Sequence, residues 1–272
     1  MVDNGSEQGA PSAVEPPAAG RSIAVVIPAK DEEARIGGTV RAAATIPGVS
    51  VVVVVDDGSS DRTGAVARSA GAEVVRHEKN RGKAAAMESG AAAVRALPAG
   101  SGGLLLFLDA DLQDTAARAA PLVAPVQADE ADMTIAMLPA QPGGGHGLVV
   151  RLSRDGIMRA TGWAATQPLS GQRCITAEAF DAALPLAAGF GVETGLTIDL
   201  LRLHFRVLEV PCDLHHRVTG ADWRAQVHRG RQFRDVGLAL ARRGVLPQRF
   251  DRVPGAAARR AVTWAEHVRR RR

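Results

Sequence analysis

The amino-acid sequence predicts an α/β fold with a mostly parallel central sheet and helices on both of its faces. In the first half of the chain, short apolar runs rich in Val, Ile and Leu alternate with longer Ala-rich segments whose apolar residues recur at helical spacing. Nearly continuous apolar runs are typical of parallel strands, because helices cover both faces of such a sheet. Polar motifs directly follow three of the runs, at the edge where open α/β sheets bind their ligands.

Each expected element is defined by its composition and by the polar residues that bound it. The β-branched or leucine-rich runs predict strands at 23–27, 51–55, 73–75, 104–108, 133–137 and 207–211. Helical composition and spacing predict helices at about 32–46, 61–70, 82–96, 115–127 and 148–160, from about 176, within 190–205, and at 223–243. The Gly-rich segments 100–103 and 141–147 and the polar segment QPLSGQR (167–173) are expected to be loops or turns.

The composition limits the classes of protein to which the chain can belong. It has 272 residues, of which 46% are apolar, yet no apolar run approaches the roughly 18 residues of a membrane-spanning helix. Residues 1–20 are polar and rich in Pro and Gly, which predicts a disordered tail rather than a signal peptide. With no secretion signal and no metal-type spacing, Cys174 and Cys212 are expected to be reduced thiols in a cytosolic protein.

The positive charge is concentrated toward the C-terminus. The formal net charge is +4, most of the cationic residues are arginines, and the chain ends on four consecutive arginines at 269–272. Such a segment can contact anionic lipid or nucleic acid, and it can equally be a solvated helix end. Aromatic residues make up only 3% of the chain, which leaves few platforms for base stacking and disfavours a nucleic-acid-binding protein.

Acidic motifs follow the first two expected strands. PAKDEE (28–33) places three acids in the first turn of a helix, where they complement the helix dipole, so this motif alone does not require a binding site. In DDGSSDRT (56–63), Gly58 suits a turn. A turn does not explain why Asp56 and Asp57 leave a buried all-valine strand side by side. Acids at this position bind ribose hydroxyls in other nucleotide-binding folds, so we expect a nucleotide site.

A basic motif, HEKNRGKAAA (77–86), leads into the third expected helix. Gly82 allows close approach of the backbone, and Arg81 and Lys83 place positive charge near the helix N-terminus, a combination that suits a diphosphate. The spacing of a P-loop is absent, and a solvated basic turn explains the motif equally well when it stands alone.

The fourth expected strand ends in a cluster of carboxylates, LFLDADLQD (106–114). Asp109 and Asp111 are two residues apart, so on an extended strand end they point the same way and repel each other unless a cation lies between them. Mg²⁺ and Mn²⁺ bind carboxylate oxygens and bridge to phosphates, so the pair predicts a divalent metal beside a diphosphate. Asp114 is explained by the fold instead, because it precedes a helix.

In their order and spacing, VVIPAKDEE, VVDDGSSDRT, NRGKAAAM and FLDADLQ resemble the motifs of family 2 glycosyltransferases with the GT-A fold. The pattern is most similar to the dolichyl-phosphate-sugar synthases and the glucosyl-3-phosphoglycerate synthases. It covers about 22–115 strongly and extends more loosely to about 240. The resemblance implies a GT-A domain at 22–254 (nucleotide-sugar side 22–140, acceptor side 141–254). With the composition, it leaves a disordered tail at 1–21 and a basic C-terminal helix or tail at 255–272.

The resemblance also implies roles for individual residues. The donor contacts are Pro28, Ala29, Glu32, Asp56, Asp57, Ser59, Lys83 and Asp109, and the acceptor side is lined by Ser170, Gly171 and Arg173. Asp111 and His216 are implied as ligands of Mg²⁺ or Mn²⁺. His215 and His216 would face opposite ways on a strand, and His216 is preferred as the residue beside Arg217. Asp109 and Glu193 are implied as catalytic residues. Glu193 is either a base that takes a proton from an acceptor hydroxyl or a first-turn helix acid.

The expected function is transfer of a sugar from a nucleotide-diphosphate sugar, UDP- or GDP-linked, to a hydroxyl or phosphate acceptor such as a polyprenyl phosphate or a small phosphorylated acid. The alternatives are a sugar-1-phosphate nucleotidylyltransferase, which normally has a Gly-rich stretch where this chain has PAKDEE, and a non-catalytic sugar-nucleotide-binding protein. Asp31 replaces the commoner Asn and the chain has no tyrosine, which leaves the sugar and base of the donor open. Inversion or retention at the anomeric centre is also open, because related families with this donor half do either. We expect a cytoplasmic protein, peripheral at most at the inner membrane face, that could form a homodimer.

Overall fold

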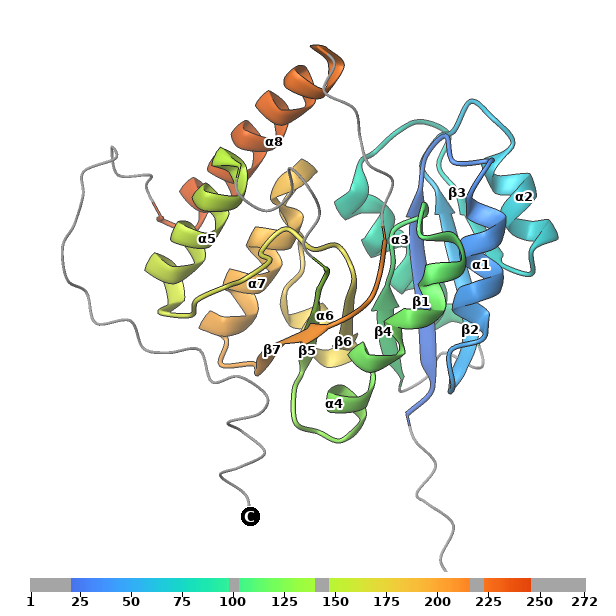
Figure 1. Ribbon diagram of the computed structural model, residues 1–272, viewed down its shortest axis with the longest axis horizontal. Coiled ribbons are helices and arrows are strands. Elements are labelled where there is room, and N and C mark those ends of the chain that lie inside the picture. Colours follow the sequence, from blue (N-terminus) through green and yellow to red (C-terminus); the bar gives the residue numbers. More distant parts are fainter. Residues whose placement is uncertain (1–20, 98–102, 140–146, 216–222, 246–272) are drawn as a thin grey trace, which may run out of the picture.

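In the computed structural model, a seven-stranded sheet carries helices on both faces (Figure 1), which confirms the predicted fold class. The structure describes residues 21–97, 103–139, 147–215 and 223–245. The strands are β1 (Ile23–Ala29), β2 (Val49–Asp56), β3 (Glu73–Arg76), β4 (Leu104–Phe107), β5 (Met133–Met137), β6 (Arg173–Thr176) and β7 (Val207–Pro211). Their order across the sheet is β3-β2-β1-β4-β6-β5-β7.

The helices are α1 (Ile36–Ala44), α2 (Thr63–Ser69), α3 (Lys83–Ala96), α4 (Ala124–Gln127), α5 (Leu148–Thr161), α6 (Ala177–Ala182), α7 (Val192–Arg202) and α8 (Trp223–Arg242), with the 3-10 helices η2 (Gln113–Leu122) and η3 (Gly189–Gly191). Most helices lie close to the predicted positions, but α1 begins at Ile36, so Asp31, Glu32 and Glu33 lie in the loop before it and not in its first turn as predicted. The helix predicted at 115–127 is divided into η2 and α4, since Pro121 and Pro125 lack the N–H groups that a continuous α-helix needs. None of the helices in the described ranges is long and apolar enough to cross a membrane.

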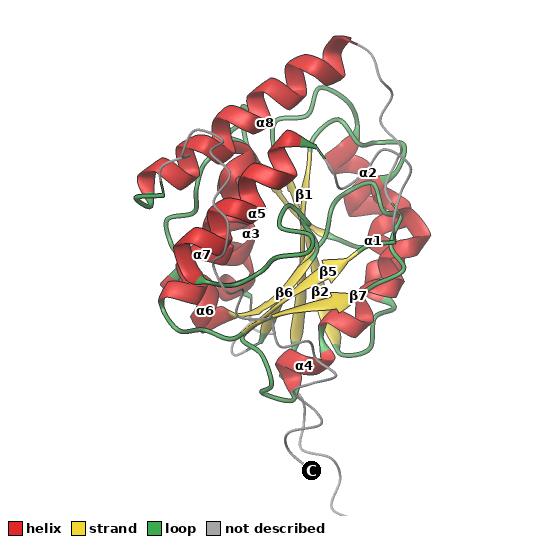
Figure 2. Ribbon diagram, turned by 60° about the vertical axis from the view of Figure 1, so that its left-hand side comes forward, coloured by secondary structure: helices red, strands yellow, loops and turns green. Residues whose placement is uncertain are grey.

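Alternate residues of the central strands supply two separate cores. Ile23 and Val25 of β1 pack on one face with α1 and η2, whereas Ala24 and Val26 pack on the other face with α3. Figure 2 shows the sheet between these two layers of helices. A third apolar cluster joins α5, α7 and α8 beyond the sheet. The run of five valines in β2 is therefore explained by burial on both faces.

Strand β6 is the one element of the described sheet that the sequence did not predict. It is antiparallel to both of its neighbours, β4 and β5, whereas the other paired strands are parallel. Its first residue, Arg173, is paired with Phe107, the last residue of β4. Because the two strands run in opposite directions, the segment that precedes β6 lies beside the segment that follows β4. This pairing brings the SGQR turn (170–173) close to the carboxylates of the DAD motif (109–111).

Candidate active site

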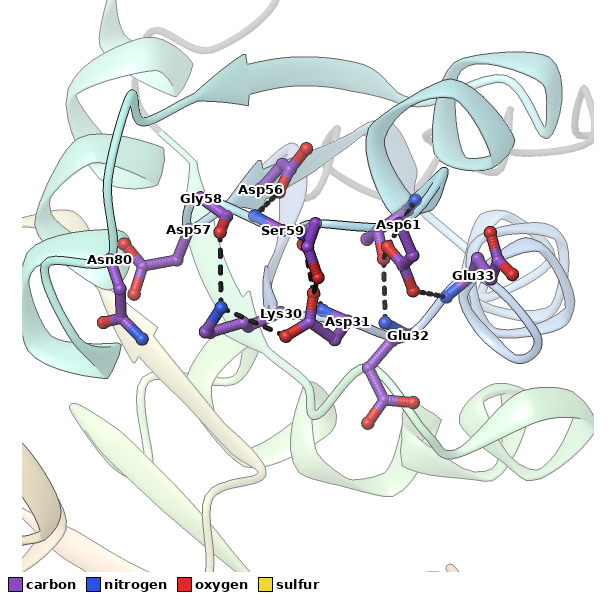
Figure 3. A network of polar contacts seen from close by, with 12 residues as sticks. Lys30, Asp31, Glu32, Glu33, Asp56, Asp57, Gly58, Ser59, Asp61 and Asn80 are labelled. Carbon is purple, nitrogen blue, oxygen red and sulfur yellow. Dashed lines mark hydrogen bonds and ion pairs between the residues drawn. The ribbon is translucent and has the colours of Figure 1, made fainter.

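The loops that follow β1 and β2 are joined by hydrogen bonds between acids and backbone amides (Figure 3). Asp31 accepts from the Ser60 N–H at 2.7 Å, and Asp61 accepts from the Glu33 N–H at 3.1 Å. In return, Glu33 accepts from the Arg62 N–H at 2.9 Å. The two loops that resemble a donor-binding region thus form one connected surface at the carboxyl edge of the sheet.

Asp31, which replaces the commoner Asn of the family, fits its position well. Its φ angle is 54°, a region in which Asp and Asn are the most frequent residues after glycine. The N–H of Ser60 and the ammonium group of Lys30 lower the pKa of the Asp31 carboxyl group below its ordinary value. Asp therefore suits the loop conformation as Asn would, and its carboxylate adds a negative charge to the group that accepts the hydrogen bond from the Ser60 N–H.

Asp57 is fully engaged with the loop that precedes α3. Its carboxylate lies 2.7 Å from Nδ1 of His77 and accepts from the N–H groups of Arg81 and Gly82 at 2.8 Å each. Burial alone would raise its pKa, but these hydrogen bonds outweigh the burial and hold the pKa of Asp57 below its usual range. Asp57 thereby fixes the backbone at the point where the helix of Lys83 begins.

Asp56 is also committed to protein partners. Its side chain is completely buried, accepts from the Ser59 N–H at 2.9 Å and pairs with Arg76 at 2.6 Å. Gly58 completes the turn at a φ of 69°, and a Cβ there would lie 2.7 Å from the backbone N of Asn80. The predicted contacts of Asp56, Asp57 and Ser59 with a nucleotide stay predictions, but the structure gives each acid a clear role in shaping the loops.

Lys83, Asp109 and Glu193 form the central cluster of the candidate active site. Nζ of Lys83 donates to Asp109 Oδ1 at 2.8 Å and lies 2.9 Å from Glu193 Oε1. The other oxygen of Asp109 accepts from Nε2 of Gln172 at 2.6 Å. Burial would lower the pKa of Lys83, but the two carboxylates outweigh it and raise that pKa above its ordinary value. Lys83 is therefore a permanent positive charge between two acids that are far apart in the sequence.

Glu193 faces a cavity as well as Lys83. It lies in the first turn of α7, and 11% of its side chain is exposed. A cavity of about 190 Å³ is lined by Lys83, Val149, Leu169, Phe190, Glu193 and Gln232. An acceptor hydroxyl placed in this cavity would be within reach of the Glu193 carboxylate, as a general base requires.

The turn before β6 approaches the cluster closely. A Cβ on Gly171 would lie 2.5 Å from Lys83 Nζ and 2.8 Å from Asp109 Oδ1, so any side chain there would displace the pair. Ser170, which is buried, donates its hydroxyl to Gln172 Oε1 at 3.2 Å and orients the amide that holds Asp109. The predicted acceptor residues Ser170 and Gly171 therefore lie at the centre of the candidate site.

Arg173 was predicted to line the acceptor side, but the structure places its guanidinium group inside the protein. The residue is only 1% exposed, and its hydrogen bonds go to the carbonyls of Pro168 and Ser170 and to the hydroxyl of Thr197. Burial lowers the pKa of Arg173 to about 10, which still leaves it charged at neutral pH. The predicted contact of Arg173 with an acceptor stays a prediction.

The predicted metal ligands are only partly described. Strand β4 ends at Phe107, so Asp109 lies beyond the strand and Asp111 in the turn that follows, and the period-two alternation expected for a strand end does not apply to them. Asp111 is half-buried there, while His216 lies outside the described residues. No group of three His, Cys, Asp or Glu side chains suited to a metal occurs within the described ranges. Asp111 nevertheless fits a site completed by a diphosphate, because Mg²⁺ in such sites takes one or two carboxylates together with phosphate oxygens.

The remaining predicted donor residues occupy the end of β1 and the loop that follows it. Pro28 and Ala29 are the last two residues of β1, and the Ala29 carbonyl accepts from the Asp57 N–H at 2.9 Å. Glu32 pairs with Nε of Arg35 at 2.8 Å, and Figure 3 shows its carboxylate pointing away from the loop that follows β2. Their predicted contacts with a nucleoside stay predictions.

Two further residues of the site were not singled out from the sequence. His77 holds Asp57, and Gln172 holds Asp109. Both lie within recognised motifs, His77 in HEKNRGK and Gln172 in SGQR, and this position was the one feature of the sequence that could have marked them as site residues. The partners could not be found from the sequence, since each contact joins segments at least 20 residues apart.

Comparisons with known proteins agree with this geometry. Residues 24–172, more than half of the chain, match the family model described as Glycosyl transferase family 2. The chain belongs to this family. The family resemblance and the GT-A fold expected from the four motifs are thereby confirmed.

Relatives within family 2 include the glucosyl-3-phosphoglycerate synthases of mycobacteria. The chain is 33% identical over 200 residues to the synthase of Mycobacterium tuberculosis (strain CDC 1551 / Oshkosh), a match that covers 66% of this chain and 61% of the relative. It is 32% identical over 200 residues to the synthase of Mycolicibacterium paratuberculosis, with coverage of 66% and 60%. The match thus spans about three fifths of the length of these curated relatives.

Solved structures of the M. tuberculosis synthase have the same fold. One, in complex with Mn²⁺, UDP and phosphoglyceric acid, has a TM-score of 0.68 at 28% identity and covers 85% of this chain and 81% of that chain. Another, in complex with Mg²⁺ and UDP, has a TM-score of 0.69 at 29% identity, with coverage of 85% and 82%. At 85% of this chain, the structural similarity extends beyond the region matched by the family model.

Proposed function

We propose that the protein is a metal-dependent glycosyltransferase that moves a sugar from a nucleotide-diphosphate sugar to a small phosphorylated acid. The observation that carries this proposal is the cluster of Lys83, Asp109 and Glu193 at the carboxyl edge of the sheet. It places one fixed positive charge and two carboxylates beside a cavity of about 190 Å³, in a chain of glycosyl transferase family 2. A non-catalytic sugar-nucleotide-binding protein would have no need for a buried acid at the acceptor cavity.

The proposed donor is UDP-linked. Structures of the related M. tuberculosis synthase contain UDP or UDP-glucose together with Mn²⁺ or Mg²⁺, which supports a uracil nucleotide and a divalent metal here. Asp111 and His216 would hold the metal together with the diphosphate. When bound, the metal supplies positive charge that stabilises the departing diphosphate. Lys83 supplies a second positive charge beside Asp109, and such preorganised charges are usually the largest catalytic contribution.

The proposed acceptor is a phosphorylated acid of the size of phosphoglycerate. Structures of the same relative contain phosphoglyceric acid or glycerol 3-phosphate, and the cavity beside Glu193 is small. Glu193 would accept the proton of the acceptor hydroxyl as the sugar is transferred. A polyprenyl phosphate is the alternative acceptor. The membrane contact through the basic C-terminus and the homodimer stay predictions, and residues 246–272 lie outside the described ranges.

Titration calorimetry with UDP-glucose and a panel of other UDP- and GDP-sugars, with and without Mn²⁺, tests the donor. We expect binding of UDP-sugars that requires the metal and is lost in Asp111→Asn. Transfer to 3-phosphoglycerate, glycerol 3-phosphate or a short polyprenyl phosphate, followed by mass spectrometry, tests the acceptor. The proposal fails if no nucleotide sugar binds in a metal-dependent way. Release of pyrophosphate from a nucleoside triphosphate and a sugar 1-phosphate would identify a nucleotidylyltransferase instead.

A further inference from the structure

We infer that Arg173 is a positioning residue that ties the turn orienting Asp109 to the helix that carries Glu193. The catalytic consequence of this inference rests on the proposed function, whereas the mechanical connection does not. The connection is a continuous chain of hydrogen bonds through the protein interior, from the turn at 168–170 to the first turn of α7.

One end of the connection is the turn before β6. Nε of Arg173 donates to the Ser170 carbonyl at 3.0 Å, and Nη2 donates to the Pro168 carbonyl at 3.2 Å. The turn between these two carbonyls supplies Leu169 to the wall of the cavity and continues into Gln172, whose amide holds Asp109. The arginine fork therefore fixes the conformation of the segment that approaches the Lys83–Asp109 pair.

The other end of the connection is α7. Nη1 of Arg173 donates to Thr197 Oγ1 at 2.9 Å, and the Thr197 hydroxyl donates to the carbonyl of Glu193 at 2.8 Å. Thr197 uses its single proton for Glu193 and a lone pair for Arg173, so the direction of the chain is fixed. The backbone of Glu193 is thus connected to the turn by one buried side chain and one hydroxyl.

The chemistry of this position requires arginine. The guanidinium group directs its donors along fixed directions, and three of these reach oxygens on two different segments. A lysine could retain the charge but would reach these oxygens from a single nitrogen. Burial has the largest effect on the pKa of Arg173 and lowers it. The negative charges of Glu193 and Glu209 act in the opposite direction and help the buried guanidinium group to stay charged. Arg173 is only 1% exposed, whereas a residue whose role is to contact an acceptor directly would have to be accessible to it.

The inference is tested with Arg173→Lys, Thr197→Val and the double variant. Steady-state kinetics with the donor and acceptor found active for the wild type should show kcat reduced about 10- to 100-fold in Arg173→Lys and less in Thr197→Val, because a shift of the order of 1 Å has such effects. The donor KM should stay within about twofold, since the loops after β1 and β2 are not held by Arg173. The double variant should resemble Arg173→Lys alone, as expected for two residues in one connection.

Hydrogen exchange measured by mass spectrometry tests the connection without any assay of activity. Amides in 169–172 and 192–198 should exchange about tenfold faster in Arg173→Lys and in Thr197→Val than in the wild type, while those of β1 and β2 should not change. The matched control is Arg206→Lys, because Arg206 also has several partners, namely Asp129 and Asp132, but lies at the exposed surface away from the cavity. It should leave both segments and kcat unchanged.

The two kinds of failure can be told apart. If the wild type transfers no sugar, the proposed function fails, and the exchange experiment decides on Arg173 by itself. The inference is overturned if exchange in both segments is unchanged in Arg173→Lys and Thr197→Val. It is also overturned if their effects on kcat simply multiply in the double variant, or if Arg173→Lys raises the acceptor KM without lowering kcat, as a direct contact with the acceptor would do.

Discussion

Acids at two places on the same edge of the sheet are held in different ways. After β1 and β2, Asp57 accepts from two backbone N–H groups and lies against His77. Asp31 accepts from the backbone N–H of Ser60, and also from the Ser60 hydroxyl and the Lys30 ammonium. At the junction of β4, β6 and α7, Asp109 and Glu193 are held by the side chain of Lys83. Backbone donors fix an acid in one position and shape a loop. The Lys83 ammonium instead brings a full positive charge to both carboxylates, so the second place is suited to a substrate with developing charge.

The largest effects on activity are expected from variants of the cluster of Lys83, Asp109 and Glu193. Lys83→Met and Glu193→Gln should each lower the rate of sugar transfer by about 10²- to 10⁴-fold, the range for loss of a charged group or general base at the reaction centre. The measurement is kcat/KM under metal-saturated conditions. Glu178→Gln is the matched control, because Glu178 is also a first-turn helix acid but lies exposed on α6. Equal losses in Glu178→Gln and Glu193→Gln would contradict the assignment.

The next largest effect is expected at Gly171. Gly171→Ala places a Cβ within 2.5 Å of the present position of Lys83 Nζ, so the pair with Asp109 must shift. We expect the turnover number to fall by about 10- to 100-fold, since a misplacement of the order of 1 Å has this consequence. Gly237→Ala is the control, because a Cβ there meets no atom within 4 Å in the described structure. If Gly171→Ala and Gly237→Ala were equally active, the close approach would have no catalytic importance.

Among the backbone-held acids, Asp57→Asn should affect folding stability as well. The amide group cannot accept all three hydrogen bonds that the carboxylate accepts, so we expect a loss of about 1–3 kcal/mol in the free energy of unfolding at pH 7. Because the folded-state pKa of Asp57 is lowered, the wild-type advantage should be complete above the unfolded-state pKa of about 3.9. It should disappear as the pH falls through the folded-state pKa. Urea denaturation at pH 7, 5 and 3 measures the difference, and a difference that does not change with pH would argue against the assignment.

The smallest effect is expected at the cysteines. Burial raises the pKa of Cys174 to about 12 and that of Cys212 to about 11, so almost no thiolate is present at pH 8. Iodoacetamide should leave both residues unmodified in the native protein and alkylate both in urea, as mass spectrometry can show. Rapid alkylation of native Cys174 would indicate that the junction around β6 opens more readily than its packing suggests.

The sequence predicted the parallel part of the fold well because its strands are apolar on both faces. The valine run of β2 and the strand at 133–137 are examples, and both were placed within two residues of their bounds. Strand β6 was missed because its four residues, RCIT, follow a polar turn and contain too few apolar positions to show a period. This antiparallel strand matters most for the candidate site, because it places the SGQR turn beside Asp109.

The candidate residues could be predicted more reliably than their partners. Lys83, Asp109 and Glu193 each lie in a recognisable motif, but nothing in the sequence indicated that one ammonium group would contact both acids. The buried place of Arg173 was equally hidden, because the motif SGQR gives no information on burial. Such contacts depend on how distant segments pack, which local patterns do not encode.

The most direct test of the central claim is a transfer assay with UDP-glucose, Mn²⁺ and 3-phosphoglycerate, carried out on the wild type, Lys83→Met and Asp57→Asn at a temperature at which all three are folded. We expect sugar transfer by the wild type, a loss of about 10²-fold or more in the kcat of Lys83→Met, and a much smaller loss of kcat in Asp57→Asn, whose predicted contact with the donor nucleotide would act on the donor KM. Equal loss in both variants would contradict the distinction between lysine-held and backbone-held acids. Full activity of Lys83→Met would remove the cluster from the active site.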